Sequence, residues 1–213
     1  MPKIKDTFSD SCVRCDRLAS FLSEIRATEP SYFAKPVPSF GSERPKILVV
    51  GLAPGMHGAN RTGRPFTGDY AGILLYETLH KFGFSNKSES INKTDGLTLI
   101  DIRITNAVRC LPPQNKPTGE EVKNCNKFLL EEISRVKKNG VILALGGVAH
   151  GACLRALELK PTLFPFGHES LHHLPNGLSL LSSYHCSRYN TQTKRLTESM
   201  FHAVFEKAKS LVS

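Results

Sequence analysis

Four short apolar segments alternate with longer amphipathic segments along the chain. The apolar segments occupy residues 46–51, 98–102, 141–146 and 178–183. Each is nearly continuous in hydrophobicity instead of alternating with polar residues, as expected for strands buried on both faces of a parallel sheet. We therefore predict four strands.

The amphipathic segments predict helices between and after these strands. Apolar side chains recur at helical spacing in five ranges: 13–26, 71–82, 120–138, 148–157 and 197–211. The second helix has a C-cap candidate in Gly83 and an N-cap candidate in Asp69. Strands that alternate with helices predict an α/β sandwich with a mainly parallel central sheet, and we expect one domain over residues 1–213.

Three polar stretches rich in glycine or proline follow the predicted strands, at residues 53–68, 111–119 and 184–194. In open α/β sheets, ligands bind in the crevice beyond the carboxyl ends of the strands. We expect these three loops to line one cleft.

Composition narrows the class of protein. The 213 residues are 40% hydrophobic and 22% charged, which excludes a disordered tail. No apolar run approaches the roughly 18–20 residues of a membrane span, and the N-terminus lacks the apolar centre of a signal peptide. These features predict a cytoplasmic protein without a membrane partner. The net charge of +9 favours an anionic partner, of which nucleic acid is the commonest.

The first loop carries candidate chemistry. Residues 51–72 hold six glycines and two prolines, without the spacing of a Walker loop or a dinucleotide fingerprint. Phe66 in this polar loop can stack on a flat ring, and Arg61 and Arg64 can contact phosphate. The alternative is a long strand-to-helix connection that ends at the capping Asp69.

Four of the six cysteines have a suggestive spacing. Cys12 and Cys15 form a C-x-x-C pair, and Cys110 and Cys125 follow with 14 residues between them. In a reducing compartment, such cysteines are thiols or metal ligands and not disulfides. The spacing alone leaves zinc and an iron–sulfur cluster equally open.

Three segments together resemble a known family. They are GLAPG at 51–55 with HGANRTGRPFTGD after it, ITNAVRCLPPQNKPT at 104–118, and SYHCSRYN at 183–190. In this order they are similar to the motifs of the uracil-DNA glycosylase superfamily, in its family 5 variant. The resemblance implies a three-layer α/β/α sandwich with a four-stranded sheet. It also implies a monomeric enzyme that hydrolyses the N-glycosidic bond of uracil, and of other deaminated bases, in DNA.

The resemblance also implies roles for single residues. His185 hydrogen-bonds the base carbonyl and stabilises the leaving anion, which suits uracil because its anion is stable. Asn106 recognises the base edge or takes part in catalysis, and Phe66 stacks on the flipped base. Gly51 and Ala53 belong to the base-binding motif.

One departure from the wider superfamily affects the attacking water. Most members carry an Asp or Glu near Ala53, whereas GLAPG offers no carboxylate. We consider Asn60 as the residue that holds the water, with Asp69 and His57 as rivals.

The resemblance assigns the remaining candidates to DNA and to a cofactor. The loop after His185, with the DNA-binding candidates Ser187, Arg188 and Tyr189, enters the duplex, and Arg188 or Tyr189 fills the gap left by the base. The four cysteines, Cys12, Cys15, Cys110 and Cys125, match the ligands of a [4Fe–4S] cluster in families 4 and 5. Cys153 lies in a helical pattern and is expected in the core, and Cys186 has no assigned role.

Two other classes of function remain open. The missing carboxylate near Ala53 is compatible with a nucleic-acid-binding module that has lost catalysis. A small-molecule hydrolase or a redox protein that uses the metal centre is the third possibility.

Overall fold

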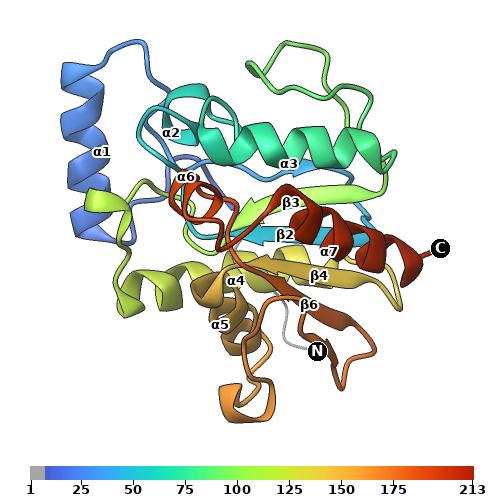
Figure 1. The fold of residues 1–213 in the computed structure, drawn as a ribbon. Helices are drawn as coiled ribbons and strands as arrows, with labels where there is room; N and C mark the ends of the chain where they lie inside the picture. The colour runs from blue at the N-terminus through green and yellow to red at the C-terminus, as the bar shows by residue number, and fades with distance from the viewer. Residues whose placement is uncertain (1–7) are drawn as a thin grey trace.

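A computed structural model describes residues 8–213, where a mixed sheet lies between two layers of helices (Figure 1). The strands are β1 (Phe40–Gly41), β2 (Ile47–Gly51), β3 (Ile102–Asn106), β4 (Val141–Leu145), β5 (Leu171–His173) and β6 (Ser179–Ser183). Their order is β1-β3-β2-β4-β6-β5, and the inner four are parallel. The α/β prediction is confirmed, but this sheet has six strands instead of four.

The two additional strands are short and lie at the edges. Strand β1 pairs antiparallel with β3, and β5 pairs antiparallel with β6. They contain two and three residues and are only partly buried. Segments this short leave no periodic hydrophobic pattern, so the sequence did not reveal them.

The second predicted strand was placed four residues too early. Strand β3 comprises Ile102–Asn106, so only Ile102 of the predicted range belongs to it, and Leu99 forms an isolated bridge with Ser85. The charged Arg103 interrupts the apolar pattern of this strand. Its side chain is buried and forms an ion pair with Glu132, which satisfies the charge.

Seven α-helices surround the sheet in the described part of the chain. They are α1 (Asp16–Thr28), α2 (Ala59–Thr62), α3 (Tyr70–Lys81), α4 (Gly119–Ser134), α5 (Gly147–Ala156), α6 (Arg188–Gln192) and α7 (Glu198–Ser210). The five long helices match the predicted ones with small shifts at their ends. Asp69 caps α3 as predicted, because its carboxylate accepts a hydrogen bond from the Gly72 N–H. Helices α2 and α6 are single turns that the sequence did not indicate.

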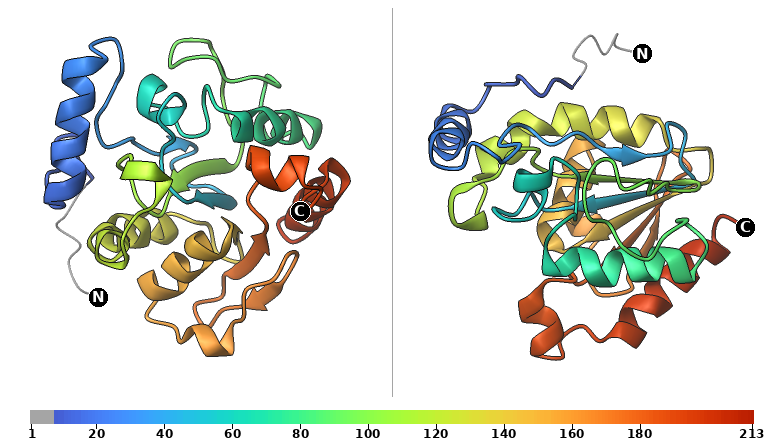
Figure 2. Two further views of the ribbon diagram at one scale, coloured as in Figure 1. Left: turned by 60° about the vertical axis from the view of Figure 1, so that its left-hand side comes forward. Right: turned by 90° about the horizontal axis from the view of Figure 1, so that it is seen from above.

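Alternating side chains of each strand face the two helical layers. Ile47 and Val49 of β2 pack toward α3 and α7, whereas Leu48 and Val50 pack toward α4 and α5. Seen from above, α4 lies on one side of the sheet and α3 and α7 lie on the other (Figure 2). All five residues of each inner strand are buried, as a doubly covered parallel sheet requires.

The parallel arrangement brings the ends of the inner strands to one edge. Gly51 at the end of β2 is in register with Asn106 at the end of β3, and Leu145 is in register with Ser183. The loops that follow these strands therefore emerge side by side. Within residues 8–213, no helix has the length and apolar character needed to span a membrane.

Candidate active site

A cavity of about 440 Å³ lies beyond the carboxyl ends of β2, β3 and β6. All three predicted loops contribute to it. Its lining residues are Leu52, Ala53, Gly55, Ala59, Phe66, Asp69, Tyr70, Ala71, Asn106, Asn115, His185, Ser187 and Arg188. The prediction of a shared cleft is confirmed, and the volume falls in the range of small-molecule sites.

Gly51 allows two other candidates to meet at this cavity. A Cβ atom at this position would lie 2.6 Å from Cζ of Phe66 and would also collide with Oδ1 of Asn106. The missing side chain therefore provides the space in which the Asn106 amide and the Phe66 ring approach each other. Gly51 contributes by leaving this space open for the two side chains, and it is not itself on the cavity wall.

Phe66 forms one wall of the cavity in an unusual backbone conformation. Its φ is +54°, in the left-handed region that aromatic residues rarely adopt. Its ring stacks on the imidazole of His185, with a centroid separation of 5.9 Å and an interplanar angle of 23°. The two residues predicted to handle the base thus form one side of the pocket together.

His185 lies two residues after the end of β6. Burial lowers the pKa of its imidazole to about 4, because desolvation disfavours the charged form. Its backbone carbonyl accepts a hydrogen bond from Nδ2 of Asn190 at 2.8 Å, which fixes the local chain. No described residue hydrogen-bonds the ring nitrogens, so a neutral imidazole is available to a ligand in the cavity.

Asn60, the first candidate for holding water, is not part of the cavity wall. It is fully buried, and neither atom of its side-chain amide has a hydrogen-bond partner among the described residues. His57, one rival, is exposed, and its Nδ1 contacts the hydroxyl of Tyr32 at 2.7 Å. The structure therefore does not bring either residue to the predicted base position.

Asp69, the other rival, does line the cavity. Its Oδ1 accepts the Gly72 N–H at 2.9 Å, and its Oδ2 faces Gly58, where a Cβ atom would come within 2.5 Å. Burial raises the pKa of this carboxyl, although the hydrogen bond from Gly72 lowers it. The Asp69 carboxylate, one oxygen of which caps α3, therefore borders the cavity.

The DNA candidates after His185 lie at the mouth of the same cavity. Ser187 and Arg188 line it, and Ser187 also caps α6 by accepting the Asn190 N–H. The Arg188 guanidinium lies 5.4 Å from the ring centroid of Tyr70. Tyr189 is 71% exposed and points to no described core residue. This loop is accessible to a large partner.

The two arginines of the first loop have different surroundings. Arg61 is exposed, and its Nε donates to the His57 carbonyl at 2.7 Å. Arg64 is only 4% exposed, and it forms a buried ion pair with Asp95 at 2.8 Å. The expectation that Arg64 contacts phosphate is wrong for this conformation, because its charge is already neutralised inside the protein.

Two polar lining residues were missed at the level of sequence. Asn115 reaches the cavity from the second loop with φ of +57°, a conformation in which Asn is enriched. Tyr70 is the first residue of α3 and is 41% exposed. The NKPT turn was a usable signal for Asn115, whereas nothing in the sequence distinguished Tyr70 from a surface tyrosine.

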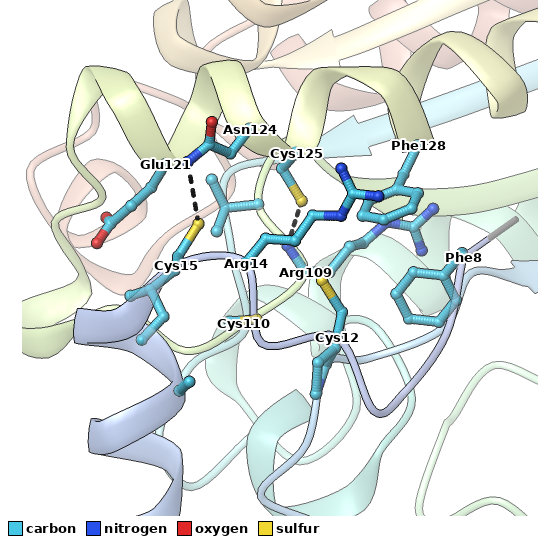
Figure 3. A pocket seen from close by; sticks show the side chains of 14 residues that line it. Phe8, Cys12, Arg14, Cys15, Arg109, Cys110, Glu121, Asn124, Cys125 and Phe128 are labelled. Atoms are coloured by element: carbon cyan, nitrogen blue, oxygen red, sulfur yellow. Dashed lines mark hydrogen bonds between the residues drawn. The ribbon is translucent and has the colours of Figure 1, made fainter. Parts of the chain in front are cut away.

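The four spaced cysteines line a second cavity, between the N-terminal segment, the second loop and α4 (Figure 3). Cys12 and Cys15 precede α1, Cys110 lies in the loop after β3, and Cys125 lies on α4. Two nitrogen donors reach the sulfurs: Nδ2 of Asn124 lies 3.6 Å from Sγ of Cys15, and the Arg109 N–H donates to Cys125. Tertiary structure thus unites residues 113 positions apart.

The chemistry of this cysteine site favours bound positive charge. Burial and the neighbouring cysteines raise the pKa of the Cys110 thiol, so several thiolates are unstable there unless cations compensate them. Among residues 8–213, no three His, Cys, Asp or Glu side chains are arranged to hold a single metal ion. In a four-iron cluster each thiolate binds a different iron, which needs a wider arrangement than one ion does.

The two remaining cysteines are buried away from this site. Cys153 is fully buried among the side chains of the α4–α5 layer, as expected. Cys186 is also fully buried, and its Sγ lies 3.5 Å from the Ala71 carbonyl of α3. This contact ties the loop after β6 to the start of α3, at the rim of the first cavity.

Comparisons with known proteins identify the family to which the chain belongs. The family model of the uracil DNA glycosylase superfamily matches residues 38–209. The type-5 uracil-DNA glycosylase of Thermus thermophilus is 45% identical over 206 residues, which cover 94% of each chain. The type-5 enzyme of Pyrobaculum aerophilum is 40% identical and covers 93% of this chain and 88% of its own. The type-4 uracil-DNA glycosylase of Archaeoglobus fulgidus is 34% identical over 71% of this chain and 63% of its own. The chain therefore belongs to the uracil DNA glycosylase superfamily, and within it to the type-5 family.

Proposed function

We propose that this protein is a monofunctional uracil-DNA glycosylase of base excision repair, which removes uracil and other deaminated bases from DNA. One observation carries the proposal: Asn106 at the end of β3, Phe66 in the loop after β2 and His185 in the loop after β6 meet at one cavity. No lysine among residues 8–213 lines this cavity, and none falls at a motif position where a Schiff base would be expected, so strand cleavage is not expected. Family membership and the relatives' printed names support the same reaction.

Base recognition follows from two of these side chains. Leaving the duplex stack costs free energy of unpairing and unstacking. The extrahelical base then enters the cavity and stacks on the Phe66 ring. The Asn106 amide carries two donor hydrogens and an acceptor oxygen, which can satisfy the edge of uracil in both senses. Since this side chain is only 4% exposed, its partners in the bound state come from the base and not from solvent.

His185 stabilises the departing base. As the bond between C1′ of the sugar and N1 of uracil breaks, its electron pair moves onto the base and negative charge builds on a carbonyl oxygen. A neutral imidazole N–H donates a hydrogen bond to that oxygen, in a buried site where such a bond is strong. The depressed pKa of His185 keeps the ring neutral at physiological pH.

For the attacking water, we favour Asp69 over Asn60. Asp69 lies on the cavity wall, whereas Asn60 does not. The Asp69 carboxylate accepts a proton from the water as the water oxygen bonds to C1′, and its raised pKa makes it a better base than a solvent-exposed carboxylate. The carboxylate missing from the GLAPG motif is thereby replaced from the far end of the same loop.

The protein binds DNA through the face around this cavity. Ser187 and Arg188 line the cavity, the next residue Tyr189 is exposed, and Arg188 or Tyr189 fills the space that the flipped base leaves. Arg61 is the first-loop arginine still available to a phosphate. With a net charge of +9, the affinity for DNA falls as salt concentration rises.

The four cysteines hold a [4Fe–4S] cluster in this proposal. The convergence of the four cysteines on one cavity and the N–H donors aimed at two of their sulfurs support such a group. When bound, the cluster supplies cross-linking and not bond cleavage, because it is separate from the residues that line the base cavity. Cys12 and Cys15 then tie the start of α1 to α4 and to the loop after β3.

The remaining proposals concern the whole chain. Side chains of α1 and α7, from opposite ends of the described chain, join the two cores on the sheet, which supports a single domain over residues 1–213. The monomeric state is proposed on the resemblance to the family alone. An enzyme with this substrate works in the cytoplasm, at the nucleoid.

The proposal is tested with a duplex that contains a single uracil. The protein should release uracil and leave an abasic site that breaks only after alkali treatment. Breakage without alkali would contradict monofunctional chemistry. Tight binding to this duplex without base release would instead favour the non-catalytic binding module. Related duplexes with hypoxanthine or xanthine, and single-stranded substrates, define the range of bases.

A further inference from the structure

The segment 85–98, between α3 and β3, is attached to the first loop through Asp95. Both oxygens of this carboxylate accept hydrogen bonds from Nη1 of Arg64, at 2.8 and 2.9 Å. The two side chains are 5% and 8% exposed, so this is a buried ion pair. We refer to residues 85–98 as the β3-leading loop.

Asp95 also organises the β3-leading loop itself. Its carboxylate accepts backbone N–H groups of Ile91 at 2.8 Å, Asn92 at 3.2 Å and Leu97 at 2.9 Å. Burial alone would raise the pKa of Asp95, but these donors and Arg64 hold it at about 2. One ionised side chain therefore fixes the loop on one side and Arg64 on the other.

Further contacts clamp the residues on both sides of Phe66. The Thr67 and Ser90 hydroxyls lie 2.7 Å apart, and the Tyr76 hydroxyl donates to the Pro65 carbonyl at 2.8 Å. Ser90 also accepts a hydrogen bond from Arg64 at 2.9 Å. Hence each neighbour of Phe66 is held by a group outside the first loop.

This clamp has a consequence for Phe66. A phenylalanine in the left-handed region is strained, and such a conformation persists only where the surroundings over-determine it. At the cavity, the Phe66 ring stacks on the imidazole of His185. The β3-leading loop lies outside all three motif loops, yet it holds Arg64 and Thr67 on either side of Phe66, while Tyr76 of α3 holds Pro65.

We propose that Asp95 is a positioning residue for the base pocket: through Arg64 it holds Phe66 in the orientation that stacks on the extrahelical base. This inference rests on the proposed function, since it assigns the loop a part in uracil release. The effect of Asp95 passes entirely through Phe66 and involves no contact with the base.

The primary test compares two changes in the same loop. Asp95→Asn removes the charge but retains an acceptor oxygen for the backbone, and Glu89→Gln is the matched control because Glu89 is exposed. With saturating enzyme, we expect Asp95→Asn to slow uracil release roughly 10- to 100-fold, as a misplaced pocket residue does. The affinity for uncleaved duplex should stay within about twofold, and Glu89→Gln should match wild type.

A double-mutant cycle separates positioning from general stabilisation. In a Phe66→Ala background, Asp95→Asn should change the rate of release by less than about twofold, because the ring through which it acts is gone. If the fold-decreases in release rate of the two single substitutions multiply in the double variant, the proposal is overturned. A folded Asp95→Asn protein with wild-type rate would also overturn it. Should Asp95→Asn fail to fold, Ser90→Ala removes only the hydroxyl contacts and is expected to slow release in the same Phe66-dependent way.

A spectroscopic readout makes the outcome independent of activity. The proton on Cε1 of His185 experiences the ring current of Phe66, so its NMR shift reports the stack. We expect this resonance to move in Asp95→Asn and to stay in Glu89→Gln. An unmoved resonance overturns the positioning role. Wild-type protein that releases no uracil overturns the proposed function alone, since the resonance still tests Asp95.

Discussion

The ring of Phe66 stacks on the imidazole of His185, with centroids 5.9 Å apart and planes inclined by 23°. The two residues belong to loops that follow different strands, β2 and β6. In the proposed mechanism this stacking orients the imidazole, so the donor to the leaving base is preorganised before DNA arrives. Base recognition by Phe66 and leaving-group stabilisation by His185 would then depend on each other.

Replacing His185 tests its role directly. We expect His185→Ala to slow single-turnover release of uracil by about 100- to 1,000-fold, the loss typical of one preorganised donor. The matched control is His173→Ala, a histidine on the edge strand β5 that lies outside the cavity. A His185→Ala protein with wild-type rate would remove this residue from the mechanism, and the same result for His185→Ala combined with Asn106→Ala would refute the proposed site.

The pH dependence of kcat/KM follows from the neutral state of His185. Because burial holds its pKa at about 4, the imidazole is uncharged in the free enzyme above that pH. We expect kcat/KM to show no histidine titration between about pH 5.5 and 8, near the ordinary histidine pKa of about 6.5. A rise in kcat/KM as pH falls through 6.5 would instead show that the charged form is active.

The depressed pKa of His185 also predicts that folding stability falls as pH is lowered. The pKa of His185 is lower in the folded state than in the unfolded chain, so the unfolded chain binds the proton first. The contribution of neutral His185 to the free energy of unfolding is complete above the pKa of the unfolded chain, about 6.5. It decreases as pH falls from about 6.5 toward about 4. Urea unfolding between these values, compared with His185→Ala, measures the contribution; a variant with the same pH slope as wild type would contradict it.

Asp69→Asn distinguishes between the two candidates for holding water. Asn is also a good N-cap, so α3 should retain its capping hydrogen bond and the protein its stability. Without a proton acceptor, the rate of uracil release should fall by about 100-fold or more. An active Asp69→Asn together with an inactive, folded Asn60→Ala would return the role to Asn60.

Two neighbouring glutamates on α4 predict contrasting effects on stability. Glu132 pairs with the buried Arg103 and Arg109, whereas Glu131 pairs with Arg135 at the surface. Glu132→Gln leaves buried positive charge and should lower the free energy of unfolding by about 3–5 kcal/mol. Glu131→Gln should cost about 1 kcal/mol or less. Equal effects in urea denaturation would show that the buried network is not stabilising.

The cysteine site predicts both iron content and stability. Purified without oxygen, wild-type protein should contain about four irons and four inorganic sulfides per chain. Cys125→Ser should lose most of this iron and unfold at a lower temperature, whereas Cys153→Ala should keep its full iron content. Stoichiometric zinc in place of iron and sulfide would identify the alternative metal instead.

The alternation of buried strands and amphipathic helices was sufficient to predict the sandwich. Strand β2 and the cap of α3 by Asp69 followed from local patterns, because continuous hydrophobicity and capping chemistry act within a few residues. Strand β3 was misplaced because the ion pair that makes a buried Arg103 tolerable comes from Glu132, far away in the chain. Edge strands β1 and β5 depend on pairing alone.

For the site, residue identities and motif order were enough to select His185, Asn106, Phe66 and the four cysteines. That three loops line one cleft was predicted from the shared edge where parallel strands end, and the structure confirms it. Arg64 shows the limit most clearly: in sequence it is a loop arginine suited to phosphate, and only the folded chain places Asp95 against it. Local interactions determined the elements of this protein, whereas burial and long-range charge pairing decided which side chains remain free to act.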